Sequence, residues 1–505
     1  MTKFILKRLG ISFLVLLGGS VLMYVLTISS GDPLADLRES NAKNKEQLID
    51  SRIAYMGLDQ PWYQRYWNWL RGAAGCVYGA CNLGTNRNGV NVTSLLGNAA
   101  SSTLRLVILA TLLAIVIGIA VGIITAIRQY SGFDYVVTFL TFLFFSLPVF
   151  WAAVLLKEFG AIRYNDWIAS PTISFTQALL IGLVLAVILQ SVLGGDWRRR
   201  ALTAGITVVF VVAALMYFTA AGWWRAPALG IGIVTLVSIA AAVGVTALVA
   251  GLANRRVLYA TLTTVGVGVI AYYVVGPMLV SPTFPLLLLF LIIAIGVGLA
   301  SGWFWGGYSR KVAMGLSALT AVIMGLLFVL DRAVYAWAGL LKLKPRPIST
   351  IGSNTPNFTG NFWETLLDNG TQLLLPTILL TLISIASYSR YTRSSMLETM
   401  NQDFVRTARS KGLSERVVIV KHAFRNALIP ITTIVAFDFA GLIGGAVITE
   451  KVFGWKGMGE LFISGLTAVD PAPVMAFFLV TGLAAIIMNM LADIAYAFLD
   501  PRIRR

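Results

Sequence analysis

Arg406-Thr407-Ala408-Arg409-Ser410-Lys411-Gly412 begins a polar, basic stretch that continues through His422 to Pro430 and separates two strongly apolar runs. Loops between membrane spans are usually short turns, so a long polar segment at this place suggests a surface that another molecule contacts. Binding of anionic lipid headgroups by its basic side chains is the simpler alternative.

Helix signals give this stretch a definite shape. Asn401 or Asp403 is expected to cap a first short helix, and Gly412 is expected to end it in a left-handed conformation. Ser414 is expected to cap a second helix. Its apolar side is predicted to consist of Val417, Val418, Val420 and Phe424. A helix–glycine–helix unit of this kind favours docking to a protein over binding to lipid alone.

The composition predicts an all-α polytopic membrane protein. Of the 505 residues, 57% are hydrophobic and 12% are charged, too few charges to solvate a soluble protein of this size. The net charge of +17 is not a nucleic-acid signal, because the basic residues gather in alternate short loops, at 198–200, 255–256 and 310–311. That alternation follows the positive-inside rule with the N-terminus inside.

Twelve apolar runs are predicted to span the membrane. They lie at about 9–28, 101–127, 135–156, 174–194, 201–221, 228–252, 257–275, 285–305, 312–330, 371–389, 427–449 and 473–497. The first run has no small-residue cleavage site after it, so residues 1–28 are expected to be a retained span rather than a signal peptide. Residues 29–100 then form an extracytoplasmic segment, and both termini are expected to be cytoplasmic.

The two cysteines, Cys76 and Cys81, both fall in that extracytoplasmic segment. In an oxidising compartment this spacing predicts a small disulfide, with two free thiols as the alternative. A metal site needs more ligands than this pair, and the single histidine, His422, is expected on the opposite side of the membrane. No metal site is therefore predicted.

Several stretches resemble the inner-membrane permeases of ABC importers, and most of all the first permease of the oligopeptide/dipeptide/nickel branch. The similar stretches are 392–398, 403–414 and 422–430 around the basic segment, Gly31-Asp32-Pro33, 145–151 (FSLPVFW), 450–459 (EKVFGWKGMG) and 499–504 (LDPRIR). They cover about 1–157 and 360–505. The resemblance implies a type I permease core of six spans, within a permease domain at 95–497.

In this family the basic segment, here 388–426, is a coupling loop with the so-called EAA motif, which sits in a cleft of a cytoplasmic ATPase subunit. Carried over, Arg406, Thr407, Ala408, Arg409 and Gly412 are the expected ATPase-coupling residues. The chain has Arg-Thr-Ala where the consensus has Glu-Ala-Ala, as is usual in the peptide branch. The chain departs further in the six apolar runs at 173–331, which are expected to be an inserted membrane domain.

The resemblance also implies the partners: a second homologous permease, two cytoplasmic ATPases, an extracytoplasmic substrate-binding protein and the bilayer of a prokaryotic cell membrane. No catalytic residue or cofactor is expected in this chain. It has no G-x-x-x-x-G-K-[ST] loop to hold phosphates, so ATP and Mg²⁺ are expected on the ATPase subunits.

Asp438 lies inside an expected span, where an ionisable group is costly and usually faces a cavity or a partner. A role in the path or an interface and a satisfied structural hydrogen bond both remain open for it. Gly441 and Gly445 form a small-residue pair suited to close helix contact, within the bundle or with a second permease.

The predicted function is the permease subunit of an ATP-driven peptide importer that forms half of the transmembrane path. The alternative is a twelve-span secondary transporter driven by an ion gradient. That class typically has two similar halves with intramembrane polar groups, whereas the expected inserted spans contain no charge.

Overall fold

The computed structural model describes residues 2–499, and within that range the backbone is helical apart from turns, loops and an isolated bridge between Thr85 and Asn91. The helices are α1 (Thr2–Ser29), α2 (Ala35–Arg38), α3 (Lys45–Met56), α4 (Trp62–Ala74), η1 (Gly75–Tyr78), α5 (Val92–Ile127), α6 (Gly132–Ser146), α7 (Val149–Lys157), η2 (Glu158–Ile162), α8 (Arg163–Ala169), α9 (Phe175–Leu193), α10 (Trp197–Ala220), α11 (Gly230–Val249), α12 (Arg255–Val275), η3 (Gly276–Leu279), α13 (Phe284–Trp305), η4 (Gly307–Ser309), α14 (Arg310–Leu343), α15 (Phe362–Met400), α16 (Asp403–Ser410), α17 (Glu415–Val417), η5 (Val418–Phe424), α18 (Arg425–Gly445), α19 (Val447–Phe453), α20 (Met458–Thr467) and α21 (Pro471–Leu499).

Ten helical segments of the described chain are long and apolar enough to cross a membrane, so the chain is an all-α polytopic membrane protein. An eleventh span arises if α6 and the helical segment Val149–Ala169, bent by 103° to each other, cross as one. The span expected at 135–156 is thus broken within its length in the structure. Leu147 takes an extended conformation because Pro148 follows it, and this breaks the helix.

Two further expectations about the spans need correction. The expected run at 174–194 is α9, whose described apolar part, Phe175–Ser191, is too short to count among the ten. The expected span at 312–330 is part of α14, which continues to Leu343 and carries a buried acid, Asp331. Its carboxylate accepts hydrogen bonds from Gly230 N at 2.9 Å and Tyr272 OH at 2.6 Å. Because Asp331 lies within this longer span, the expectation that the inserted spans contain no charge was wrong.

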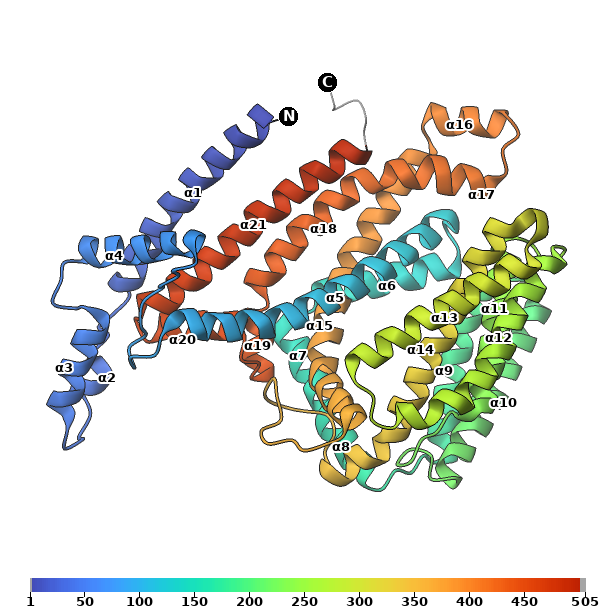
Figure 1. Ribbon diagram of the computed structural model, residues 1–505, viewed down its shortest axis with the longest axis horizontal. Coiled ribbons are helices and arrows are strands. Elements are labelled where there is room, and N and C mark those ends of the chain that lie inside the picture. The colour runs from blue at the N-terminus through green and yellow to red at the C-terminus, as the bar shows by residue number, and fades with distance from the viewer. Residues whose placement is uncertain (1, 500–505) are drawn as a thin grey trace.

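The centre of the fold is the pair α5 and α15, which pack along their length (Figure 1). Gly118 and Gly122 of α5 make this possible, because a Cβ added at Gly118 would lie 2.7 Å from Cβ of Tyr388. Helices α18, α20 and α21 pack on the same pair, and α1 packs on α21. The start of α1, the end of α21 and the basic helix α16 lie toward the same side of the molecule in Figure 1.

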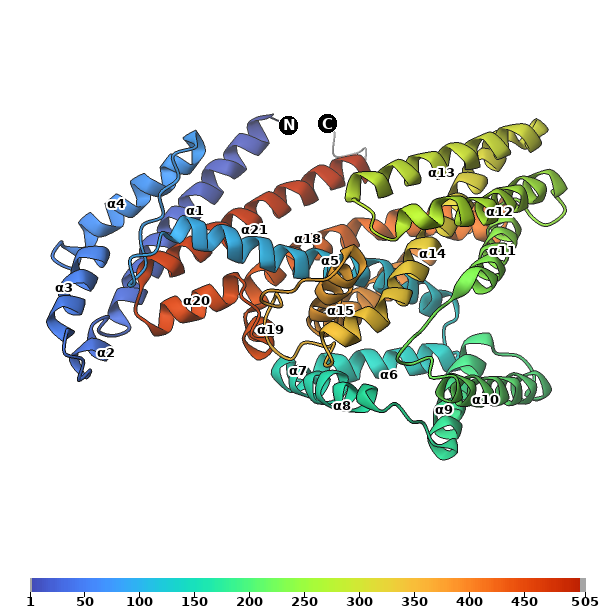
Figure 2. The same ribbon diagram turned by 60° about the horizontal axis from the view of Figure 1, so that its bottom comes forward.

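The region expected to be an insert has two parts. Helices α11–α14 form a bundle with its own buried clusters, one around Val257 and Leu316 and another around Val265 and Met324. Helices α9 and α10 form a hairpin beside it, seen as a separate layer in Figure 2. No residue of α10 is buried. This is the exposure expected of a helix surrounded by lipid.

Residues 29–100 fold as a small helical segment against α1 and α21. One face of α4 buries Tyr66 and Trp69 against Tyr24 and Met475. The Tyr66 hydroxyl lies 2.8 Å from the hydroxyl of Ser20. Helix α4 is thus amphipathic, with its other aromatic side chains exposed.

Candidate functional site

The basic segment forms a short protruding helix, α16, whose two faces differ in character. Arg406, Thr407 and Arg409 are exposed, whereas Val405 and Ala408 are 0% and 5% exposed. Val405 and Ala408 join a buried apolar cluster with Ala126, Met396, Val418, Ala423 and Ala427. Ala408 therefore lies on the inner face of α16 and anchors the helix to this cluster, rather than lying on its outer surface.

The turn after α16 has the predicted left-handed glycine. Gly412 has φ +73°, and its N–H donates to the carbonyl of Arg409 at 2.9 Å. The predicted N-caps are wrong, since Gln402 occupies that position. Asn401 instead ends α15, where its side chain donates to the carbonyl of Leu397, and Asp403 lies in the first turn of α16. There the Asp403 carboxylate lies at the positive end of the helix dipole, which stabilises α16.

The second predicted helix is continuous with the next span. Ser414 stands at its start without a side-chain cap, and α17 passes through the π-helix η5 into α18. Because a π-helix shifts the side-chain period, the predicted apolar face is only partly right. Val418 and Ala423 are buried, whereas Val420 is 59% exposed. In the structure α15 extends to Met400, so α16, the Gly412 turn, α17 and η5 make up the segment between α15 and α18.

An ion pair closes the glycine turn. Arg409 contacts Glu415 through two hydrogen bonds, of 2.7 and 3.2 Å, across Gly412. The Arg409 hydrogen bond holds the pKa of Glu415 below its usual value, and the Glu415 hydrogen bond raises the pKa of Arg409. Both side chains are largely exposed, so the pair contributes little to stability and mainly orders the turn.

A second ion pair lies behind this surface and was not predicted. Arg393 of α15 donates through Nε and Nη2 to both oxygens of Asp134, at 3.0 and 2.9 Å. Asp134 is buried and belongs to α6. A two-pronged pair of this kind fixes orientation as well as distance, so it joins α6 to the end of α15 that leads into α16.

Asp438 is engaged within the chain. Its Oδ2 accepts hydrogen bonds from Tyr388 OH at 2.6 Å and Ser384 Oγ at 3.0 Å, which join α18 to α15. This geometry favours the structural interpretation of Asp438. Gly441 is exposed, and a Cβ placed there meets nothing within 4 Å, so in this chain it makes no close helix contact. Gly445 lies outside the residues whose side chains are described.

Glu450 is a buried acid that the sequence analysis did not select. It is 0% exposed and accepts hydrogen bonds from Thr103 Oγ1 (2.6 Å), Gly459 N (2.7 Å) and Glu460 N (3.1 Å). Burial raises its pKa, against the opposing effect of these donors. A signal was present: Glu450 directly follows an apolar run and precedes a stretch with three glycines at 454, 457 and 459.

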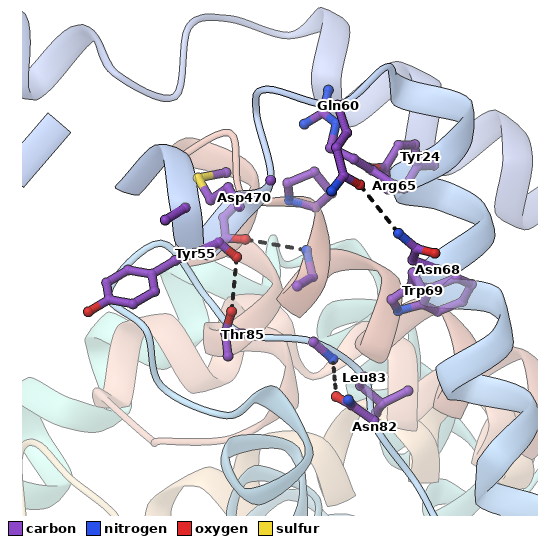
Figure 3. Close-up of a pocket in the computed structure, with 16 residues that line it drawn as sticks. Tyr24, Tyr55, Gln60, Arg65, Asn68, Trp69, Asn82, Leu83, Thr85 and Asp470 are labelled. Carbon is purple, nitrogen blue, oxygen red and sulfur yellow. Dashed lines mark hydrogen bonds between the residues drawn. The ribbon is translucent and has the colours of Figure 1, made fainter. Parts of the chain in front are cut away.

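Cys76 and Cys81 are joined by a disulfide that closes the turn after α4. The segment 29–100 meets the turn before α21 around a polar cavity of about 310 Å³ (Figure 3). Asp470 at its edge accepts hydrogen bonds from Arg87 N (2.6 Å) and Ala472 N (3.3 Å). Burial raises the pKa of Asp470. These bonds attach the segment to the α20–α21 turn.

No group of three or more histidine, cysteine, aspartate or glutamate side chains is placed to hold a metal ion in the described chain.

Comparison with known proteins gives consistent matches. Residues 278–505 match the family described as binding-protein-dependent transport system inner membrane component. The oligopeptide transport system permease protein OppB of Mycobacterium tuberculosis is 41% identical over 189 residues, 37% of this chain and 57% of that protein. AppB of Bacillus subtilis, an oligopeptide transport system permease protein, is 37% identical over 172 residues, 33% of this chain and 53% of that protein.

A putative peptide transport system permease protein of Brucella abortus is 34% identical over 234 residues, 44% of this chain and 68% of that protein. The chain thus spans little more than half the length of the Mycobacterium relative that it matches, at 57%. The family match begins at residue 278, inside the region expected to be inserted, so it does not confirm the insert or its boundaries.

Proposed function

Because the chain belongs to the family of binding-protein-dependent transport system inner-membrane components, we propose that it is a permease subunit of an ATP-driven peptide importer. It forms half of the transmembrane path, and a second homologous permease forms the other half. Peptide cargo is supported by the similarity to permeases whose names specify oligopeptides or peptides.

The observation that carries this proposal is the protruding helix α16. Its outer face is basic and exposed, while Val405 and Ala408 fix its inner face to the ends of α5, α15 and α18. A helix held in this way transmits a push or pull from a partner to three spans at once. Arg406, Thr407, Arg409 and the Gly412 turn are the contact with the ATPase, and Ala408 is its anchor.

Energy comes from the partners in this proposal. Two cytoplasmic ATPase subunits bind ATP and Mg²⁺, and their closure on ATP shifts the permease pair between outward-open and inward-open states. This chain has no phosphate-binding loop of the Walker type, so the proposal places ATP hydrolysis on the partner subunits. Cargo arrives on an extracytoplasmic binding protein.

The same proposal fixes the topology in a prokaryotic cell membrane. The side of α16 is cytoplasmic, and the start of α1 and the end of α21 lie toward that side (Figure 1). Residues 29–100 are then extracytoplasmic, with Val77 and Tyr78 exposed in the turn closed by the disulfide as a contact for the binding protein. Helices α9–α14 are an accessory membrane domain outside the path, a role supported by the separate buried clusters of α11–α14.

Cysteine labelling is expected to establish this topology. Because Cys76 and Cys81 are disulfide-bonded and extracytoplasmic, an impermeant maleimide is expected to label intact cells only after reduction. The double variant Cys76→Ser/Cys81→Ser gives the background. Labelling without reductant contradicts the disulfide, and reduced cysteines that react only in lysed cells contradict the topology.

The function itself is tested by reconstitution. Proteoliposomes containing this chain, the second permease and both ATPases, with binding protein outside and ATP inside, are expected to accumulate peptide. Uptake is expected to require ATP hydrolysis and to persist when ionophores collapse ion gradients. Uptake driven by an imposed ion gradient without ATP would instead establish the secondary-transporter alternative.

A further inference from the structure

A second polar cavity lies at the outer end of the α5–α15 pair and is not explained by packing. It has a volume of about 510 Å³ and is lined by α5, α15, the linker before α15 and the turn after α19. Arg105 of α5 and Lys456 of the turn line it, together with three asparagines and three serines. Acidic side chains are absent from its lining.

The polar side chains of this cavity are free to bind a ligand. In the described chain Arg105 and Lys456 have no carboxylate partner, and the side chains of Asn98, Asn354 and Asn369 make no hydrogen bond. Arg38 and Lys344, by contrast, are paired with Asp32 and Asp368. The cavity thus combines uncompensated positive charge with open amide and hydroxyl groups.

The backbone segments that carry the two cations are held together by buried hydrogen bonds. Trp455, 2% exposed, donates from its indole nitrogen to the carbonyl of Ser102 on α5 at 3.2 Å. One residue further, Thr103 donates to the buried Glu450 and accepts from Met458 N at 2.8 Å. These bonds tie the turn that carries Lys456 to the helix that carries Arg105, so both line the cavity before any ligand arrives.

This chemistry matches the end of a peptide. A carboxylate accepts charge-assisted hydrogen bonds from Arg and Lys, and asparagine and serine side chains both donate to and accept from peptide amides. The cavity lies at the end of the α5–α15 pair remote from α16. We infer that it is an entry site for peptide cargo, with Arg105 and Lys456 binding the C-terminal carboxylate and the asparagines contacting the backbone. This inference rests on the proposed function.

The test compares a peptide carrying a free C-terminus with its C-terminal amide in the reconstituted complex. The affinity of the binding protein for each form is measured separately, and uptake is measured with the binding protein saturated. Wild type is expected to take up the free acid at least about tenfold faster than the amide at low concentrations of loaded binding protein. Arg105→Gln/Lys456→Gln is expected to remove that preference by slowing uptake of the free acid alone.

Two control variants accompany Arg105→Gln/Lys456→Gln. Arg105→Lys/Lys456→Arg keeps both charges and is expected to keep the preference, while Arg225→Gln removes an exposed cation from the α10–α11 turn and is expected to change nothing. Unchanged cargo-free ATP hydrolysis shows that each complex assembles. If the Gln/Gln variant still prefers the free acid over the amide, the inference is overturned. It is also overturned if uptake of both peptides falls equally, because that indicates that the two cations contact another subunit. A wild-type complex that imports no peptide overturns the proposed function and the inference together.

Discussion

Replacing Gly412 by valine is expected to abolish the stimulation of ATP hydrolysis by cargo in the reconstituted importer. Gly412 has φ +73°, a conformation that a β-branched residue adopts at a cost on the order of 1–3 kcal/mol. A Cβ there meets nothing within 4 Å, so the strain lies in the backbone and not in a clash. The turn is expected to shift, which misaligns the outer face of α16 with the ATPase.

A matched variant separates the backbone effect from the loss of glycine as such. Asparagine tolerates the left-handed conformation, so Gly412→Asn is expected to keep most of the stimulation. Both variants are expected to insert and to purify with the partner subunits, since the Ala408 cluster is untouched. Full coupling in Gly412→Val would refute the assignment of this turn to the coupling surface.

The helix at 403–410 and the glycine turn after it were largely predictable because their signals are local. Gly412 ends a helix of suitable length, and the alternation of apolar and basic residues over 403–410 places Val405 and Ala408 on one face. The N-cap of α16 was not predictable, because Asn401 and Asp403 both have side chains suited to an N-cap. Because α15 extends to Met400, Asn401 lies at the C-terminus of α15 instead of at the start of α16.

Contacts between segments that are distant in the chain could not be predicted from the sequence. Nothing near Asp134 in the chain indicates that Arg393 is its partner, and Thr103 and Glu450 are equally remote from each other. The bend at Leu147 could have been foreseen from Pro148, which disfavours helix at the preceding residue. The length of the apolar run concealed it. The sequence singled out Asp438 but left its role open, because its partner Tyr388 becomes evident only when α15 lies beside α18.

Glu450→Ala is expected to be among the most destabilising single substitutions in the chain. The carboxylate is fully buried and accepts from Thr103, Gly459 and Glu460, so its removal leaves three donors without an acceptor. The expected loss is on the order of 3–5 kcal/mol, because each buried unsatisfied donor costs about 1–3 kcal/mol and the site relaxes in part. Thermal unfolding in detergent measures it as a lowered Tm.

The chain supplies a close control for this substitution. Glu460 has an exposed side chain and uses only its backbone N–H in the same cluster, so Glu460→Ala is expected to leave the Tm nearly unchanged. Glu450→Gln retains an oxygen acceptor for the backbone donors, and its amide donates to Thr103 Oγ1. It is expected to lose far less than alanine. Equal Tm values for Glu450→Ala and Glu460→Ala would contradict the role of this carboxylate.

The pH dependence provides an independent measure of the same group. Burial raises the pKa of Glu450 above the ordinary value of 4.5, so the folded protein binds this proton more tightly than the unfolded chain. Its contribution to stability is therefore fully present below the unfolded pKa and is lost as the pH rises through the folded pKa. Glu450→Gln is expected to remove this part of the pH dependence, since the amide does not titrate. If the Tm falls with rising pH equally in wild type and Glu450→Gln, the effect belongs to another group. If the Tm falls with rising pH only in wild type, the titrating group is Glu450, the buried acid that joins α5 to the turn carrying Lys456.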